Sequence, residues 1–119
     1  MRFKNPIQRL RDIVENIDAV QAFAVGMTFE DFVLDRKTVY AVTRALEIIS
    51  EASRRLPDEL KSRRPGVDWP AVAAAGNVYR HEYELIDDAL VWHTIQNELA
   101  QLRELSKAEL ERLRKTESA

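Results

Sequence analysis

The spacing of the apolar residues constrains the fold of this chain more than any other feature. In the first long stretch they recur every three or four positions up to Gly26: Ile7, Leu10, Ile13, Val14, Ile17, Val20 and Phe23. This spacing places apolar side chains on one face of an α-helix. Asn5 and Pro6 form a cap and first-turn pair before it, and a glycine is typical just after a helix end. The sequence therefore predicts a long amphipathic helix before Gly26.

A second long helix is predicted between Asp35 and Leu56, just before Pro57. Its apolar stripe consists of Val39, Val42, Ala45, Leu46, Ile49 and Ala52. Between the first two helices, Thr28 and Asp31 have the spacing of a capping box, in which two side chains satisfy the free N–H groups of a helix start. A short helical turn is expected there.

The last long apolar stripe predicts a helix capped at Asp87 and ending around Leu105. Its core face consists of Leu90, Val91, Ile95, Leu99, Leu102 and Leu105. Ser106 and Glu109 then have the spacing of another capping box. They predict a separate, charged C-terminal helix over Lys107–Lys115.

The stretch from Asp68 to Glu98 carries most of the chemically interesting side chains. Asp68 is a good N-cap and Pro70 is suited to a first turn, so a helix is expected to begin here and to run through His81. A break or kink is expected at residues 83–86. The part of this helix before Asn77 has mostly small side chains, because its sequence reads AVAAAG.

These elements predict an all-α protein, an up-and-down four-helix bundle with a short extra C-terminal helix. The chain of 119 residues is long enough for one domain over residues 1–119, and it contains only three glycines and four prolines. Its lack of cysteine excludes disulfides and thiolate chemistry. No cofactor is expected, and the two histidines do not have the spacing of metal ligands.

Charge and hydropathy narrow the expected location and partners. The net charge is −2, so any nucleic-acid surface has to be local. The N-terminal region lacks the apolar core of a signal peptide, and no stretch approaches the roughly 18 apolar residues of a membrane span. We therefore expect a cytoplasmic protein with no membrane contact.

One local basic cluster follows Pro57, where a short helical turn at Asp58–Ser62 and a loop are predicted. Lys61, Arg63 and Arg64 lie close together there. Such a run is usually a solvated surface. It would supply phosphate-contacting charge if it lay near the face of the next helix that carries Asn77 and His81.

Four segments of the sequence resemble the HepT-like family of HEPN-domain proteins, along about residues 8–105. These are RDIVENID, AVGMTFEDFVLD, ALEIISEASRRLP and PGVDWPAVAAAGNVYRHEYELIDDALVWHTIQNEL. The resemblance implies a helical homodimer with a metal-independent ribonuclease centre at the dimer cleft. It also implies the toxin half of a toxin–antitoxin pair, silenced by an MntA-like nucleotidyltransferase that adenylylates a tyrosine. RNA, and not DNA, is the implied substrate.

The family motif can be carried over residue by residue. His81 matches its histidine, Asn77 its asparagine and Tyr83 the modifiable tyrosine, but Gly76 stands where the family has an arginine. Arg80 lies one turn later, and helical side chains lean toward the N-terminus, so its guanidinium could occupy the space left by Gly76. Alternatively, Gly76 lets two helices or two subunits pack closely.

Metal-free RNA cleavage needs a base, an acid and groups that stabilise the phosphate. We assign His81 to the proton transfers, Arg80 to the phosphate, and Asn77 to orienting His81 or the substrate. Two other hypotheses stay open: a catalytically inactive HEPN module that serves as the dimeric substrate-binding partner of a nucleotidyltransferase, and a purely structural helical dimer. His93 is expected to be a surface or packing residue, and Trp69 and Trp92 are expected to anchor the core.

Overall fold

The computed structural model describes residues 6–81 and 87–118, and the side chains of 6–76 and 87–116. The described chain contains helices and no strand, which confirms the predicted all-α class. The helices are α1 (Pro6–Ala24), α2 (Phe29–Leu34), α3 (Arg36–Arg54), α4 (Asp58–Ser62), α5 (Trp69–His81), α6 (Asp88–Asn97) and α7 (Leu99–Ser118).

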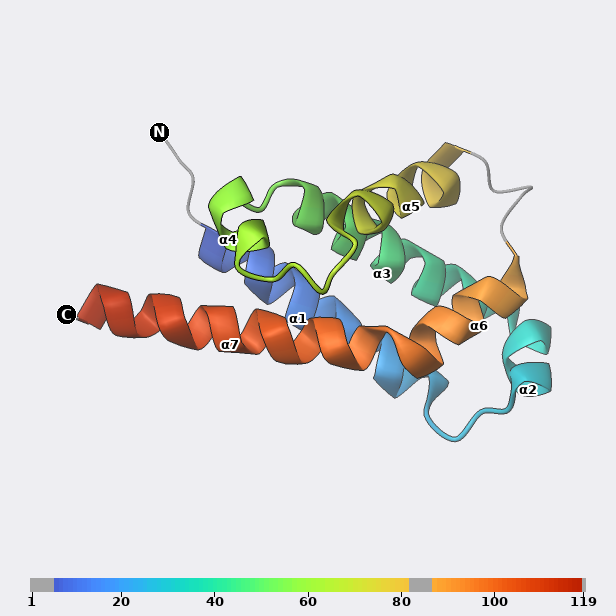
Figure 1. Ribbon diagram of the computed structural model, residues 1–119. Helices are drawn as coiled ribbons and strands as arrows, with labels where there is room; N and C mark the ends of the chain where they lie inside the picture. Colours follow the sequence, from blue (N-terminus) through green and yellow to red (C-terminus); the bar gives the residue numbers. More distant parts are fainter. Residues whose placement is uncertain (1–5, 82–86, 119) are drawn as a thin grey trace.

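Helix α3 lies in the middle of the bundle. It packs against α1 on one side and α5 on the other, and α7 covers the far side of α1 (Figure 1). The core is formed by the apolar stripes of these helices, and its most completely buried members are Leu10, Ile13, Ile17, Val20, Phe32 and Val42. The predicted stripes are thus the surfaces that pair the helices.

Most helix boundaries follow the predicted local signals. Thr28 accepts a hydrogen bond from the Asp31 N–H, and the Asp31 side chain accepts one from the Thr28 N–H, so the capping box of α2 is confirmed. Asp35 caps α3 and Asp87 caps α6. Gly26, just past the end of α1, has φ +76°, a conformation that a glycine adopts without strain.

The predicted boundary near Leu105 is wrong. Helix α6 ends earlier, with Glu98 as its C-cap, and α7 then runs without interruption from Leu99 to Ser118. Ser106 and Glu109, which were expected to form a capping box, are both almost fully buried. Their side chains are taken up by packing and ion pairing, so they do not turn back to the backbone and the helix continues through them.

Aromatic side chains pack together at the end of the bundle where α2 meets α6. Trp92 of α6 packs against Phe32 and Phe29 of α2, with ring centroids 5.2 and 6.3 Å apart. Trp69 is buried at the start of α5. Both tryptophans therefore anchor the core, as predicted. The expected break at residues 83–86 lies outside the described residues.

Candidate functional site

Helix α5 carries the predicted catalytic residues in its last turns. Its start is fixed by Asp68, whose side chain accepts a hydrogen bond from the Ala71 N–H at 3.1 Å. The helix then continues through His81, as predicted, so Asn77 and His81 lie one turn apart on it and Arg80 lies between them. The side chains of these three residues, and the whole of Tyr83, lie outside the described part of the chain.

The turn of α5 that precedes these residues is joined to α3 by a buried hydroxyl. The Ser50 Oγ lies 2.7 Å from the Val72 carbonyl oxygen and 2.9 Å from that of Ala73, and it accepts a hydrogen bond from the Gly76 N–H at 2.9 Å. Arg54, one turn further along α3, donates to the Ala73 carbonyl at 3.0 Å. Two side chains of α3 thus bind the backbone of one turn of α5.

Gly76 takes part in this contact through its backbone amide. The residue is buried, and its amide is the group that approaches the Ser50 hydroxyl. A glycine permits such close approach between helices because it has no side chain to separate them. Gly76 thus lies where the backbone of α5 meets α3.

Sequence reasoning did not single out Ser50. The available signal was its position: Ser50 and Ser53 continue the spacing of Leu46 and Ile49, so both serines face the core of the bundle. A buried hydroxyl needs a partner. In Ser50 that partner is the neighbouring helix, whereas the Ser53 hydroxyl donates to the Ser50 carbonyl of its own helix.

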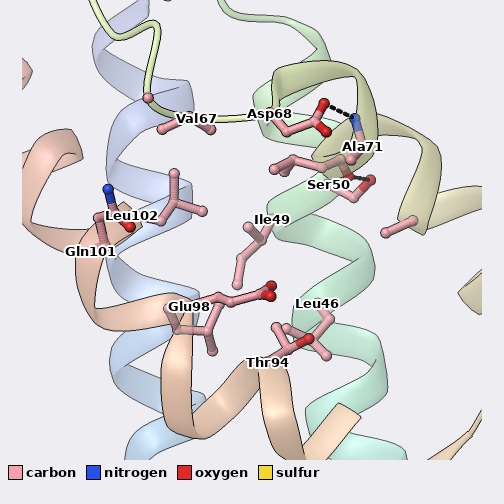
Figure 2. A pocket seen from close by; sticks show the side chains of 14 residues that line it. Leu46, Ile49, Ser50, Val67, Asp68, Ala71, Thr94, Glu98, Gln101 and Leu102 are labelled. Atoms are coloured by element: carbon pink, nitrogen blue, oxygen red, sulfur yellow. Dashed lines mark hydrogen bonds between the residues drawn. The ribbon is translucent and has the colours of Figure 1, made fainter. Parts of the chain in front are cut away.

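Beside this junction, a groove of about 430 Å³ separates α5 from α6 and α7 (Figure 2). Its floor is apolar and includes Leu46, Ile49 and Leu102, while Asp68 and Glu98 lie at its rim. No lysine or arginine is found among the described residues that line it. A groove with an apolar floor and carboxylates at its edge is unsuited to bind phosphates.

The predicted phosphate-contacting arginines are paired with an acid from another helix. Glu109 of α7 is buried and accepts hydrogen bonds from Arg63 at 3.0 Å, from Arg64 at 2.9 Å and from Arg112 at 3.3 Å. Burial by itself raises the pKa of Glu109, but these hydrogen bonds outweigh that effect, and the net pKa lies below its ordinary value. The carboxylate is therefore charged at neutral pH.

This cluster also orders the loop that leads into α5. The Trp69 Nε1 donates to the Arg64 carbonyl at 3.1 Å, so the backbone of one paired arginine is bound to the first residue of the helix. Arg63 and Arg64 consequently have a structural partner that the sequence did not suggest. Lys61 is half-buried on α4. Whether these side chains also reach RNA stays a prediction.

Large apolar side chains are exposed at one end of the bundle. They lie on or next to α1, α2, α3 and α6: Phe23, Val25, Phe29, Leu34, Tyr40 and Leu90. In Figure 1 this is the end where α2 meets the start of α6. Helix α5 runs toward the same end. An exposed apolar surface of this kind is typical of a contact with another protein.

Metal-ligating side chains do not gather in the part of the chain that the structure describes. Within it, no group of three or more His, Asp or Glu side chains could hold an ion. His93 is an exposed residue of α6 whose Nδ1 lies 3.1 Å from the Asn97 side-chain nitrogen. It is therefore a surface residue, as predicted.

Comparison with known proteins places the chain in a family. The family described as Ribonuclease HepT-like matches residues 13–109. The chain belongs to that family. The match includes all of α5 and the buried polar contacts around it, and it confirms the resemblance seen in the sequence.

Individual relatives carry ribonuclease names. The chain is 38% identical over 106 residues to "Probable ribonuclease HepT" of Thermococcus cleftensis, which covers 89% of this chain and 93% of that protein. It is 33% identical to a "Putative RNase" of Methanocaldococcus jannaschii (82% and 84% covered) and 32% identical to one of Caldanaerobacter subterraneus (92% and 97% covered). No solved structure matches the chain. Among the described helices of this HepT-like chain, none has the length and apolar character to cross a membrane.

Proposed function

We propose that this chain is a metal-independent endoribonuclease, the toxin half of a toxin–antitoxin pair, acting on RNA in the cytoplasm. The observation that carries the proposal is the helical course of α5 through His81 in a chain of the HepT-like ribonuclease family. That course keeps Asn77, Arg80 and His81 together in the last turns of one helix.

The three residue types supply what metal-free cleavage requires. Histidine titrates at about pH 6.5 when unperturbed, so His81 can take the proton of the 2′-hydroxyl or give one to the leaving 5′-oxygen. Arg80 stabilises the negative charge that develops on the phosphate. Asn77 orients His81 or the substrate. A two-fold homodimer would bring a second copy of each group to one cleft and supply acid and base together.

The exposed apolar end of the bundle supports the homodimer. Leu34 and Leu90 are 83% and 65% exposed there, beside the aromatic cluster of Trp92. Exposed apolar side chains of this size are stabilised by burial against a second surface. Because α5 runs toward the same end, pairing through this surface would bring two α5 helices close together.

The partner that we propose for this dimer is a nucleotidyltransferase antitoxin of the MntA type. It would silence the toxin by adenylylating the hydroxyl of Tyr83, two residues after His81. Adenylylation adds a bulky anionic group next to the catalytic residues, and that group would repel the RNA phosphate.

One observation favours a second function, a catalytically inactive partner of the same nucleotidyltransferase. The position of the family's motif arginine is Gly76, and this glycine is buried against Ser50. If Arg80 does not replace the missing arginine, the dimer would bind the nucleotidyltransferase without cutting RNA.

The test is cleavage of a mixed RNA pool in EDTA by the purified chain and by His81→Ala, Arg80→Ala and His93→Ala. His93 is the matched control because it is an exposed histidine outside the motif. We expect His81→Ala to lose about 100-fold or more of the activity, the usual contribution of a general acid or base. Arg80→Ala should lose a similar amount, and His93→Ala should cut like the wild type.

Two results would contradict the proposal. A wild-type chain that is folded by circular dichroism and does not cut RNA supports the inactive partner. A His81→Ala chain that cuts as fast as the wild type removes His81 from the mechanism.

A further inference from the structure

We infer that Ser50 is a positioning residue, whose hydroxyl sets the direction of the last turns of α5 and thereby the placement of Asn77, Arg80 and His81. The inference rests on the proposed function of those three residues. Ser50 belongs to a different helix and lies 26 positions before Gly76 in the sequence. Its contact is with the backbone of α5, directly before the first of the proposed catalytic residues.

The contact involves both partners of one hydrogen bond of the helix. In a regular α-helix the Gly76 N–H donates to the Val72 carbonyl. Here the Ser50 Oγ lies 2.9 Å from that nitrogen and 2.7 Å from that oxygen. A hydroxyl donates one hydrogen bond and accepts two, so it can satisfy both groups at once. Side chains that enter a helical hydrogen-bond ladder are a known cause of helix bending.

A second side chain of α3 restrains the same turn. The Arg54 Nη2 donates to the Ala73 carbonyl at 3.0 Å, and this carbonyl is also 2.9 Å from the Ser50 Oγ. The turn from Val72 to Gly76 is therefore bound to α3 at two points. Beyond Gly76 the catalytic turns depend on the direction that this anchored turn gives them.

A small change in that direction would matter. His81 lies five residues past Gly76, which is about 7.5 Å along the helix axis. A change of about 10° in the axis would then move His81 by about 1.3 Å, and a displacement of about 1 Å in a catalytic group can lower a rate about 100-fold. Loss of one hydroxyl at Ser50 could thus impair catalysis while the bundle stays folded.

Ser53 provides a matched control. It lies one turn further along the same helix and is equally buried, at 1% exposed compared with 2% for Ser50. Among the described side chains and backbone, its hydroxyl donates to the Ser50 carbonyl alone, at 2.7 Å, within α3. Ser50→Ala and Ser53→Ala therefore remove the same atom from the same environment, but only the first removes the bond to α5.

The experiment measures kcat and KM for RNA cleavage, and the pH–rate profile, for the wild type, Ser50→Ala, Ser53→Ala and Ser50→Thr. We expect Ser50→Ala to lower kcat at least tenfold with KM changed less than threefold, and its pH–rate profile to shift because His81 has moved. Ser53→Ala should keep the wild-type values. Ser50→Thr, which retains the hydroxyl, should recover most of kcat. If Ser50→Ala does not fold, Ser50→Cys fills the site with a slightly larger and more weakly hydrogen-bonding group and should lower kcat in the same sense.

A second measurement does not depend on activity. The backbone amide chemical shifts and hydrogen-exchange rates of Gly76 and residues 77–81 are compared in the folded variants by NMR. Ser50→Ala should shift these amides and speed exchange at Gly76, whereas Ser53→Ala should leave them unchanged. Unchanged amides in Ser50→Ala, or equal losses of kcat in both alanine variants, would overturn the inference. A wild type that does not cut RNA would instead overturn the proposed function, and the amide comparison would still decide whether Ser50 orients α5.

Discussion

The bundle contains two buried polar junctions that stabilise neighbouring parts of the chain in different ways. At one, the neutral hydroxyl of Ser50 binds the backbone of α5 in the turn that ends at Gly76. At the other, the charged carboxylate of Glu109 binds the guanidinium groups of Arg63 and Arg64 in the loop before α5. The first lies next to the proposed catalytic turns, and the second lies at the opposite end of the same helix.

The two junctions differ in the free energy that the fold would lose if the buried group had no partner. An unpaired hydroxyl in a protein interior costs about 1–3 kcal/mol, whereas an unpaired buried charge costs considerably more. Glu109 is 2% exposed in its side chain, so its burial depends on the arginines around it. We therefore expect the Glu109 junction to control the stability of the whole fold and the Ser50 junction to control local geometry.

The largest effect should come from Glu109→Gln. This change removes the negative charge and leaves three guanidinium groups facing one another, so we expect a loss of about 3 kcal/mol in the free energy of unfolding. The estimate is at the low end for a broken buried ion pair because the arginine side chains are 35–47% exposed. Urea unfolding followed by circular dichroism measures it. A loss below about 1 kcal/mol would mean that Glu109 is not the stronger junction.

The same comparison predicts a dependence of stability on pH. The pKa of Glu109 in the folded chain lies below its ordinary value of 4.5, so its contribution is fully present above that pH. It is lost as the pH falls through the lower folded-state pKa. The unfolding free energies of the wild type and Glu109→Gln should therefore converge between pH 5 and the acid limit of folding. A constant difference over that range would contradict the assignment.

Ser50→Ala should have a smaller effect on stability, a loss of about 1–2 kcal/mol in the free energy of unfolding. Removing a neutral hydroxyl and leaving its buried partner groups unpaired costs about that much. Ser53→Ala is the control, and it should cost less because the Ser50 carbonyl retains the partners of its own helix. Urea unfolding of both variants at pH 7 gives the difference. Here a large stability loss with normal cleavage would reverse the roles that we assign to the two junctions.

The smallest effect should come from Arg54→Met. The Arg54 side chain is 43% exposed, and its bond to the Ala73 carbonyl is accessible to solvent. We expect a loss of about 0.5 kcal/mol, within the range for exposed polar contacts. Combining Arg54→Met with Ser50→Ala in a double-mutant cycle tests whether the two side chains act together on one turn. Strict additivity would mean that they act on α5 independently.

Much of the fold was predictable because its signals are local. The capping box of Thr28 and Asp31, the cap at Asp35 and the glycine after α1 each involve residues within about one helical turn. The apolar spacing likewise defines a face before any packing occurs. The helix through His81 was predicted from the same kind of signal, so the stretch that carries Asn77, Arg80 and His81 was placed on α5 by sequence alone.

The helix end predicted near Leu105 is wrong because local sequence signals do not include tertiary contacts. Ser106 and Glu109 have the spacing of a capping box, yet both are buried in the middle of α7. The Ser106 Oγ has no hydrogen-bond partner in the described chain, so its environment is set by packing and not by a cap. The tertiary partners of Glu109 decided that the helix continues, and those partners are not evident in the neighbouring sequence.

The sequence by itself determined most of the helices, their apolar faces, the family and the position of the motif on α5. Only the tertiary structure decided that Gly76 meets Ser50 and that Glu109 meets Arg63, across 26 and 46 positions of the chain. The physical reason is that caps and amphipathic faces arise from residues within one or two turns. A buried hydroxyl or carboxylate finds its partner only when distant helices pack, and here that packing holds the start of α5 and its turn at Gly76, before the proposed catalytic residues.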